Sequence, residues 1–169
     1  MKAMKALSLL ACAFTVTAIV SGCSANGTTN LVSGTGQTLV SGTIDREKKA
    51  TALNDDMPIA PDAHIVVTLR TYRGADGAAP VFLQADGPFR GFPVAFEMAG
   101  DGARAFADRG ELLVETKVYN HAGTTLAVGD FTNEQRVSVT SQGEEVTVLV
   151  SGLESCTAQG SGGFCVGGE

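Results

Sequence analysis

The segment His64-Ile65-Val66-Val67-Thr68-Leu69-Arg70-Thr71-Tyr72 carries the clearest strand signal in this chain. β-Branched and other apolar residues dominate it, and neither glycine nor proline interrupts it. A turn region that contains two prolines, residues 54–62, precedes the segment, and a glycine-containing loop, residues 74–80, follows it. The pattern predicts a β-strand that is bounded by turns on both sides.

The same signal recurs along the chain at a spacing of about ten residues, which is typical of all-β domains. In residues 92–98, alternate apolar side chains share one face of a strand. Glycine-containing turns at 120–123 and 141–144 predict two hairpins that join neighbouring strands. The expected strands, besides the first, cover residues 39–44, 81–85, 92–98, 112–119, 125–128, 136–140 and 146–150.

Helical signals are weak by comparison. Residues 100–108 could form a single helical turn, for which Asp101 would be the N-terminal cap. No long amphipathic helix is expected elsewhere. About seven or eight short strands without such a helix predict an all-β fold, a single antiparallel β-sandwich.

The amino end has the pattern of a secretory signal peptide. Lys2 and Lys5 precede an uncharged run, residues 6–20, and small residues close it. The run is too short for a transmembrane helix, which needs about 20 apolar residues. Its last part, Val20-Ser21-Gly22-Cys23, resembles the bacterial lipobox. The alternative is an ordinary leader with an incidental cysteine.

The lipobox resemblance implies that residues 1–22 are removed and that the thiol of Cys23 is diacylated. The new amino group would then be acylated as well, and three chains make a lasting membrane anchor. The usual sorting rule, applied to Ser24, implies the outer membrane. The mature chain would begin at Cys23 and contain 147 residues, which suits a single domain.

Residues 23–38 are rich in glycine, serine, threonine and asparagine, and we expect them to form a flexible tether with a reach of about 20 Å. Within them, Leu31-Val32-Ser33-Gly34-Thr35 recurs as Leu39-Val40-Ser41-Gly42-Thr43. One echo is not a repeat array, which needs at least three units. We expect the folded domain to cover residues 39–153, and a glycine-rich tail to cover residues 154–169.

The charge of the chain excludes some partners. The net charge is −6, and removal of Lys2 and Lys5 leaves ten basic and eighteen acidic side chains, about −8. Nucleic acid is therefore not an expected partner, because no basic patch is available to neutralise phosphates. Anionic headgroups would repel such a chain, so the membrane contact is expected to come from the lipid.

Two cysteines remain once Cys12 leaves with the leader and Cys23 carries lipid. Cys156 and Cys165 form an even pair in an oxidising compartment, and a glycine-rich segment separates them. A disulfide is the preferred interpretation. Two free thiols or half of a metal site are the alternatives, but a metal would need further ligands, and His64 and His121 lack motif spacing to the cysteines.

No catalytic motif is present: the chain lacks a nucleophile elbow, a zinc-protease helix motif, a P-loop and a C-x-x-C pair. His64 is interpreted as a strand-end residue and His121 as a turn residue. Phe82, Phe92 and Phe96 are interpreted as core residues. We therefore expect no enzyme activity, no cofactor and no metal.

Adjacent carboxylates in loops do not change this expectation. Neighbouring side chains of an extended chain point apart, so neither Asp55-Asp56 nor Glu144-Glu145 makes an acid/base pair. A calcium site built on Asp55, Asp56 and Asp62 would lack EF-hand spacing.

Four motifs resemble, in this order, the YbaY/YscW family of bacterial lipoproteins. They are Val40–Ile44, Ala60–Ala63 leading into Ile65–Leu69, Phe92–Phe96 and Leu112–Val118. The resemblance covers about residues 39 to 151 and implies a small β-sandwich that is tethered to the outer membrane and faces the periplasm. The best-understood members are pilotins, which bind a secretin subunit and guide it to the outer membrane. The segment 45–49 and the cysteine tail depart from the family pattern, and no partner-binding residue can be carried over.

These observations predict a non-enzymatic outer-membrane lipoprotein that acts as a protein-binding accessory factor in the periplasm. An envelope protein such as a secretin would be its client, held in a groove or by strand addition at a sheet edge. The alternative is a small-molecule-binding or envelope-stress lipoprotein that holds a ligand between its sheets.

Overall fold

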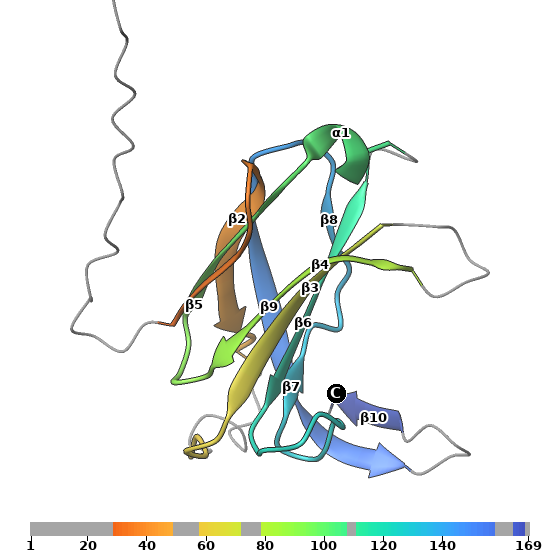
Figure 1. Ribbon diagram of the computed structural model, residues 1–169. Coiled ribbons are helices and arrows are strands. Elements are labelled where there is room, and N and C mark those ends of the chain that lie inside the picture. Colours follow the sequence, from red (N-terminus) through yellow and green to blue (C-terminus); the bar gives the residue numbers. More distant parts are fainter. Residues whose placement is uncertain (1–28, 49–57, 72–78, 108–110, 158–163, 168–169) are drawn as a thin grey trace, which may run out of the picture.

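The computed structural model describes residues 29–48, 58–71, 79–107, 111–157 and 164–167, and beyond residue 153 it describes the backbone alone (Figure 1). Strands dominate this part of the chain, so the all-β prediction is confirmed. The elements are β1 (Asn30–Gly34), β2 (Gln37–Arg46), β3 (His64–Thr71), β4 (Val81–Pro88), β5 (Val94–Gly100), α1 (Gly102–Ala105), β6 (Leu112–Tyr119), β7 (Phe131–Thr132), β8 (Val137–Val139), β9 (Glu144–Thr157) and β10 (Phe164–Gly167).

The strands form two facing layers that a single long strand joins. The pairing order is β1-β5-β2-β9-β7-β6-β3-β4, with β8 beside β6 and β10 beside β9. The first half of β9 pairs with β2 from Glu144 to Val150, and Ser151 and Gly152 then pair with β7. Because β9 passes from one layer to the other, the sheet curls until its end strands, β1 and β4, approach each other (Figure 1).

Strand direction differs in part from the antiparallel expectation. Most pairs are antiparallel, but β1 runs parallel to β5, and β2 runs parallel to β9. The hairpin expected between residues 136–140 and 146–150 is wrong, because β8 pairs with β6 while β9 pairs with β2 and β7. The turn between them carries the chain from one layer to the other, and the Glu144 carboxylate accepts the Thr140 and Ser141 N–H groups there.

Period-two patterning places the apolar side chains between the layers. Val94, Phe96 and Met98 of β5 are buried, as the alternation predicts, and Phe82 and Phe92 pack against this core. The largest fully buried side chains come from both layers, so the two layers share one core. They are Phe89, Leu39, Ile44, Ile65, Leu69, Met98, Leu112, Leu153, Val40, Val67, Val94 and Val118.

The expected strand at residues 125–128 is absent, because its backbone groups are used locally. Ala127 N–H donates to the Asp130 carboxylate at 2.7 Å, and the Ala127 carbonyl accepts from Asp130 N–H at 3.1 Å. Gly129 N–H donates to Leu153 O at 3.0 Å. These bonds fold residues 120–130 into a compact loop instead of a ladder.

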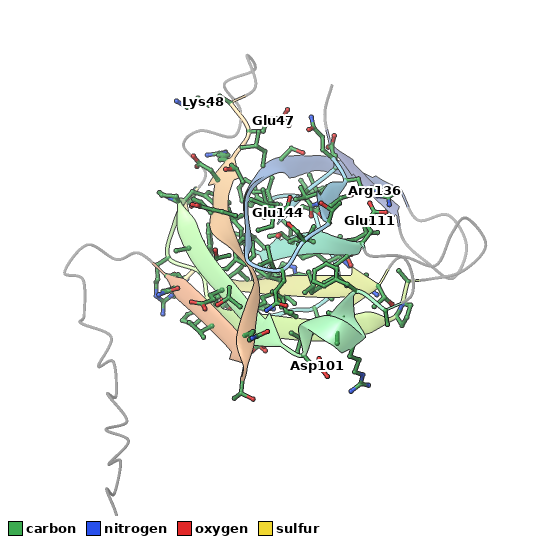
Figure 2. The ribbon with its side chains drawn as sticks, turned by 90° about the horizontal axis from the view of Figure 1, so that it is seen from above. Glu47, Lys48, Asp101, Glu111, Arg136 and Glu144 are labelled. Carbon is green, nitrogen blue, oxygen red and sulfur yellow. The ribbon has the colours of Figure 1, made fainter. Side chains whose placement is uncertain are left out.

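The predicted helical turn is confirmed as α1. Asp101 caps it, and its Oδ1 accepts the N–H groups of Ala103 at 3.0 Å and Arg104 at 3.4 Å. In the view from the α1 end, Asp101 lies at the beginning of this helix (Figure 2). The helix closes this end of the molecule, opposite the loops 58–63, 89–93 and 120–130 (Figure 1).

The tether is shorter than the sequence predicts, because residues 30–38 belong to the fold. β1 pairs with β5 from Asn30 to Gly34, and Leu31 is 4% exposed. The side chain of this leucine enters the core and adds to the ladder with β5 in holding the strand. Residues 23–28, the rest of the expected tether, lie outside the described part of the chain.

The two copies of the echoed sequence lie on opposite sides of β5. Leu31 of the first copy and Gly42 of the second are both register partners of Phe96. A Cβ at Gly34 would stand 1.9 Å from Ala99 O, and a Cβ at Gly42 would stand 1.9 Å from Val146 O. Each copy therefore needs its glycine where the backbone of a neighbouring strand comes close.

Candidate functional site

The most unusual feature of the fold is a seam where the end strands of the sheet meet without a ladder. In the described residues, β4 pairs with β3 and β1 pairs with β5, and no strand pairing joins β1 to β4. Two side-chain hydroxyls bridge the seam instead. Ser33 Oγ donates to Gln84 O at 2.6 Å, and Thr29 Oγ1 donates to Pro88 O at 3.1 Å. These contacts show that β1 and β4 run in opposite directions.

The register shows which backbone groups of β4 face the seam. Phe89 N–H, just beyond β4, donates to Ala63 O at 2.9 Å, on the side of β3. Because backbone groups alternate along a strand, Ala85 and Gly87 also face β3, while Gln84, Asp86 and Pro88 face the seam. The hydroxyl bridges to Gln84 O and Pro88 O agree with this assignment.

The backbone groups of β1 also alternate between its two neighbours. Thr29 O accepts Ala95 N–H at 3.2 Å, so Thr29, Leu31 and Ser33 direct their backbone groups toward β5. Asn30 and Val32 therefore direct theirs toward β4. The seam thus has two edges of peptide groups that no described strand pairs, and such edges are templates for an added strand.

Hollows open at both ends of the seam. The larger, about 590 Å³, lies where β1 begins and β4 ends. The smaller, about 330 Å³, lies near α1. Their linings mix backbone edges with apolar side chains: Thr29, Asn30, Leu31, Val32, Asp86, Gly87, Pro88 and Arg90 in the first, and Gly34, Thr35, Val81, Phe82, Leu83, Ala99, Gly100, Asp101 and Arg104 in the second.

Exposed apolar side chains flank this seam. Val32 on β1 is 66% exposed and Val81 at the start of β4 is 49% exposed. Leu31 points inward and fills the space over Gly87, where a Cβ would stand 2.8 Å from Leu31 Cδ2. The seam therefore offers peptide groups along its edges and apolar contacts beside them, which is what an extended peptide requires.

A second organised feature is the loop 120–130, which the buried carboxylate of Asp130 holds. Asp130 is 1% exposed. Its Oδ1 accepts Asn120 N–H at 2.7 Å, and its Oδ2 accepts Ala127 N–H at 2.7 Å and lies 3.1 Å from Nε2 of His121. The Asn120 side chain in turn accepts Ala60 N–H at 2.8 Å and donates to Pro58 O at 3.1 Å. These bonds clamp the loops 58–63 and 120–130 together.

The His121–Asp130 pair superficially resembles the base of a catalytic triad, but both ring nitrogens are occupied. Nδ1 accepts Gly123 N–H at 2.7 Å, so Nε2 carries the proton that it donates to Asp130. Neither nitrogen is left to take a proton from a nucleophile. Tyr119, between His64 and His121, stacks on His64 at 4.8 Å between ring centroids. The arrangement is one that stabilises the loop.

Two groups of charged side chains on the surface form ion pairs within the fold. Lys117 Nζ and Arg70 Nε lie 2.8 Å and 2.5 Å from the Glu115 carboxylate. Partial burial alone would raise the pKa of Glu115, but hydrogen bonds and charges from Lys117 and Arg70 outweigh it, so the pKa lies below its usual value of 4.5. Glu111 and Arg136 lie side by side in Figure 2, and Nη2 of Arg136 is 2.9 Å from Oε1 of Glu111.

Glu144 is a turn residue rather than one of a catalytic pair. Hydrogen bonds to its carboxylate from the Thr140 and Ser141 backbone, and from their hydroxyls, lower its pKa from 4.5. Of the carboxylates weighed for calcium, Asp62 is exposed, while Asp55 and Asp56 lie outside the described residues. Among the described residues no group of three or more metal-ligand side chains comes together.

The predicted modification sites fall at the margins of the structure. Cys23 lies outside the described residues. Cys156 and Cys165 are direct register partners across β9 and β10. Directly opposed residues of an antiparallel pair have α-carbons about 4.5–5.5 Å apart, within the range that a disulfide requires. The backbone thus brings together the two cysteines that the sequence paired.

Sequence reasoning missed the seam and the role of Asp130. Nothing in the composition of residues 30–34 separates β1 from a linker, apart from the apolar pair Leu31 and Val32. Asp130 follows glycine in a loop, where aspartate is common and its burial leaves no signal. No helix in the described residues is long and apolar enough to cross a membrane.

Comparison with known proteins adds no assignment. No family model, no curated protein and no solved structure matches this chain.

The clamp predicts a large effect of Asp130→Ala on stability. The change would leave the buried N–H groups of Asn120 and Ala127 without their acceptor, and each such loss costs about 1–3 kcal/mol. We expect the free energy of unfolding, measured by urea denaturation, to fall by about 3 kcal/mol. Asp62→Ala, at an exposed carboxylate, should change it by less than about 0.5 kcal/mol. Equal effects of the two variants would contradict the clamp.

Proposed function

We propose that this chain is a non-enzymatic lipoprotein of the bacterial outer membrane that faces the periplasm and binds an extended segment of a client protein along the seam. The lipid on Cys23 supplies the location, and the barrel-like domain supplies the binding surface. The resemblance to the YbaY/YscW family supports a role in envelope assembly, such as the guidance of a secretin by a pilotin. The client is an envelope protein, and it binds by adding a strand at the seam.

The observation that carries the proposal is the pair of edges at the seam. Peptide groups of Gln84 and Asp86 on β4, and of Asn30 and Val32 on β1, face a seam that the hydroxyls of Ser33 and Thr29 bridge and that no strand pairing closes in the described residues. Once the two hydroxyl bridges open and β1 and β4 move apart, an added strand would bond to these groups while its side chains reached the hollows. An unpaired sheet edge can accept a strand from another chain, so the seam suits a protein that binds an extended segment of a partner.

The packing of the molecule favours this mode over a ligand held between the sheets. Large side chains fill the space between the two layers, including Leu39, Ile65, Leu69 and Met98, all 0% exposed. The hollows lie at the seam and not in the interior. A small molecule would have to displace core side chains to reach the position that the alternative function gives it.

The test uses a proline at the seam-facing edge of β4. Asp86→Pro removes a donor that faces the gap and leaves the Ala85 and Gly87 bonds to β3 intact. Pro88 already occupies an equivalent position on the same edge. A photo-cross-linking amino acid in place of Val32 should form an adduct with an extended segment of an envelope protein in living cells, and Asp86→Pro should reduce the yield about tenfold.

Two controls separate binding from folding. Asp86→Ala keeps the N–H group and should retain the adduct, and the thermal stability of both variants should be close to that of the parent. The same cross-linker in place of Leu149, 42% exposed on the outer face of β9, should capture no such segment. Absence of any adduct at Val32, or an unchanged yield in Asp86→Pro, would refute strand addition.

We also propose that Cys156 and Cys165 form a disulfide in the mature protein. Oxidation would join the two sulfur atoms while both thiol protons and two electrons pass to a disulfide-bearing oxidant of the periplasm. The direct register of the two residues supports the pairing. The bond would fasten β10 to the end of β9 and would stabilise the fold by about 2.5–3 kcal/mol at most.

The disulfide predicts that the protein is lighter by two hydrogen atoms than its reduced form. In protein purified from the periplasm, peptide mapping without reductant should find residues 156 and 165 in one linked species, and thiol alkylation should label neither. Cys156→Ser should abolish the linked species and expose one reactive thiol at Cys165. Alkylation of both cysteines in the parent would rule the bond out.

A further inference from the structure

The loop end of the molecule lies close to the point where the chain would leave the membrane. Six residues, Ser24 to Thr29, separate the proposed lipid site from β1, and such a segment spans at most about 20 Å. Thr29 Oγ1 donates to Pro88 O at the end of β4, where the loops 58–63, 89–93 and 120–130 also lie. The lipid on Cys23 would therefore keep this end, and not the α1 end, next to the bilayer (Figure 1).

This loop end carries two of the exposed large apolar side chains of the described residues. Val128 is 61% exposed at the turn of the loop 120–130, and Ile59 is 41% exposed in the loop 58–63. Ile59 lies over Gly91, with Cδ1 3.6 Å from where a Cβ at Gly91 would stand. All three loops of this end thus take part in the surface, which we call the loop face.

Internal bonds hold the loop face in shape. Asp130 fixes the backbone around Val128 through Ala127 N–H, and Asn120 fixes the backbone beside Ile59 through Ala60 N–H. Apolar side chains on a pre-formed surface lose little entropy when they enter another medium. The buried clamp therefore has a use beyond stability, because it presents Ile59 and Val128 outward.

Among the described residues, the charges at the loop face occur in pairs of opposite sign. Asp62 and Arg90 are exposed there, and just beyond β2 lie the half-buried Glu47 and the exposed Lys48, which Figure 2 shows together. Attraction to anionic headgroups is therefore not the basis of any contact. Any contact with the bilayer would therefore be made by apolar side chains, and the short tether keeps these side chains within reach of the bilayer.

We propose that the loop face rests on the membrane, with Ile59 and Val128 inserted among the lipid headgroups. This inference depends on the lipid anchor in the proposed function and specifies the orientation of the anchored domain. In that orientation the larger hollow of the seam opens beside the bilayer, and the α1 end points into the periplasm. A client segment would then meet the seam close to the membrane surface that it is destined to enter.

A single tryptophan reports the orientation, because the chain contains none. Val128→Trp places the fluorophore on the loop face, and Val81→Trp is the matched control at the opposite end of β4, where the parent valine is 49% exposed. Each variant is purified as the lipidated full chain and reconstituted into phosphatidylethanolamine–phosphatidylglycerol vesicles that contain lipids brominated near the headgroup. Emission from Val128→Trp should fall to about half or less, and emission from Val81→Trp should change little.

The outcomes distinguish this inference from the proposed function. If both variants float with the vesicles and neither is quenched, or both are quenched equally, the orientation is wrong while the lipid anchor stands. If Cys23→Ser floats as well as the parent, or the parent does not float, the anchor fails and the orientation fails with it. Ile59→Trp provides a second position on the loop face, and it should be quenched as Val128→Trp is.

Discussion

The insertion of β1 beside β5 is the constraint on which the rest of the structure depends. Leu31 enters the core, and its close approach to Gly87 brings β1 beside β4. β1 pairs with β5 along one of its edges, and along the other it meets β4 through two hydroxyl groups and not through a ladder. The open seam, the hollows at its ends and the short tether to Cys23 all follow from the placement of this one strand.

Much of the fold could be predicted from the sequence. The strands around residues 64–71, 81–88, 94–100, 112–119 and 144–150 carry β-branched residues or clear alternation, and these features are local. Pairing is not local. The echo at residues 39–43 predicts a strand but not its position between β5 and β9, which Gly42 permits through close approach to Val146 O. The chain order therefore predicted a hairpin where β8 and β9 in fact pair with other strands.

The errors have physical causes that composition does not show. Residues 125–128 have strand-like composition, but the Asp130 carboxylate accepts the Ala127 N–H group and holds this segment in a loop. Residues 30–34 have linker-like composition, but they pair with β5 and bury Leu31 in the core. The seam could not be predicted from the sequence because it forms only where the edges of β1 and β4 meet. Neither strand carries a local signal of that meeting. Counting the cysteines predicts a bond between Cys156 and Cys165, and the backbone register of β9 and β10 places these residues opposite each other, while the bond itself stays a prediction.

The central claim is that the seam-facing edge of β4 is unpaired, and residue-resolved amide hydrogen exchange tests it most directly. The account predicts that the amides of Gln84 and Asp86 exchange rapidly, while those of Ala85 and Gly87, which face β3, are protected by at least about a hundredfold more. Equal protection of all four amides would show that β1 and β4 form a closed ladder and would contradict the account.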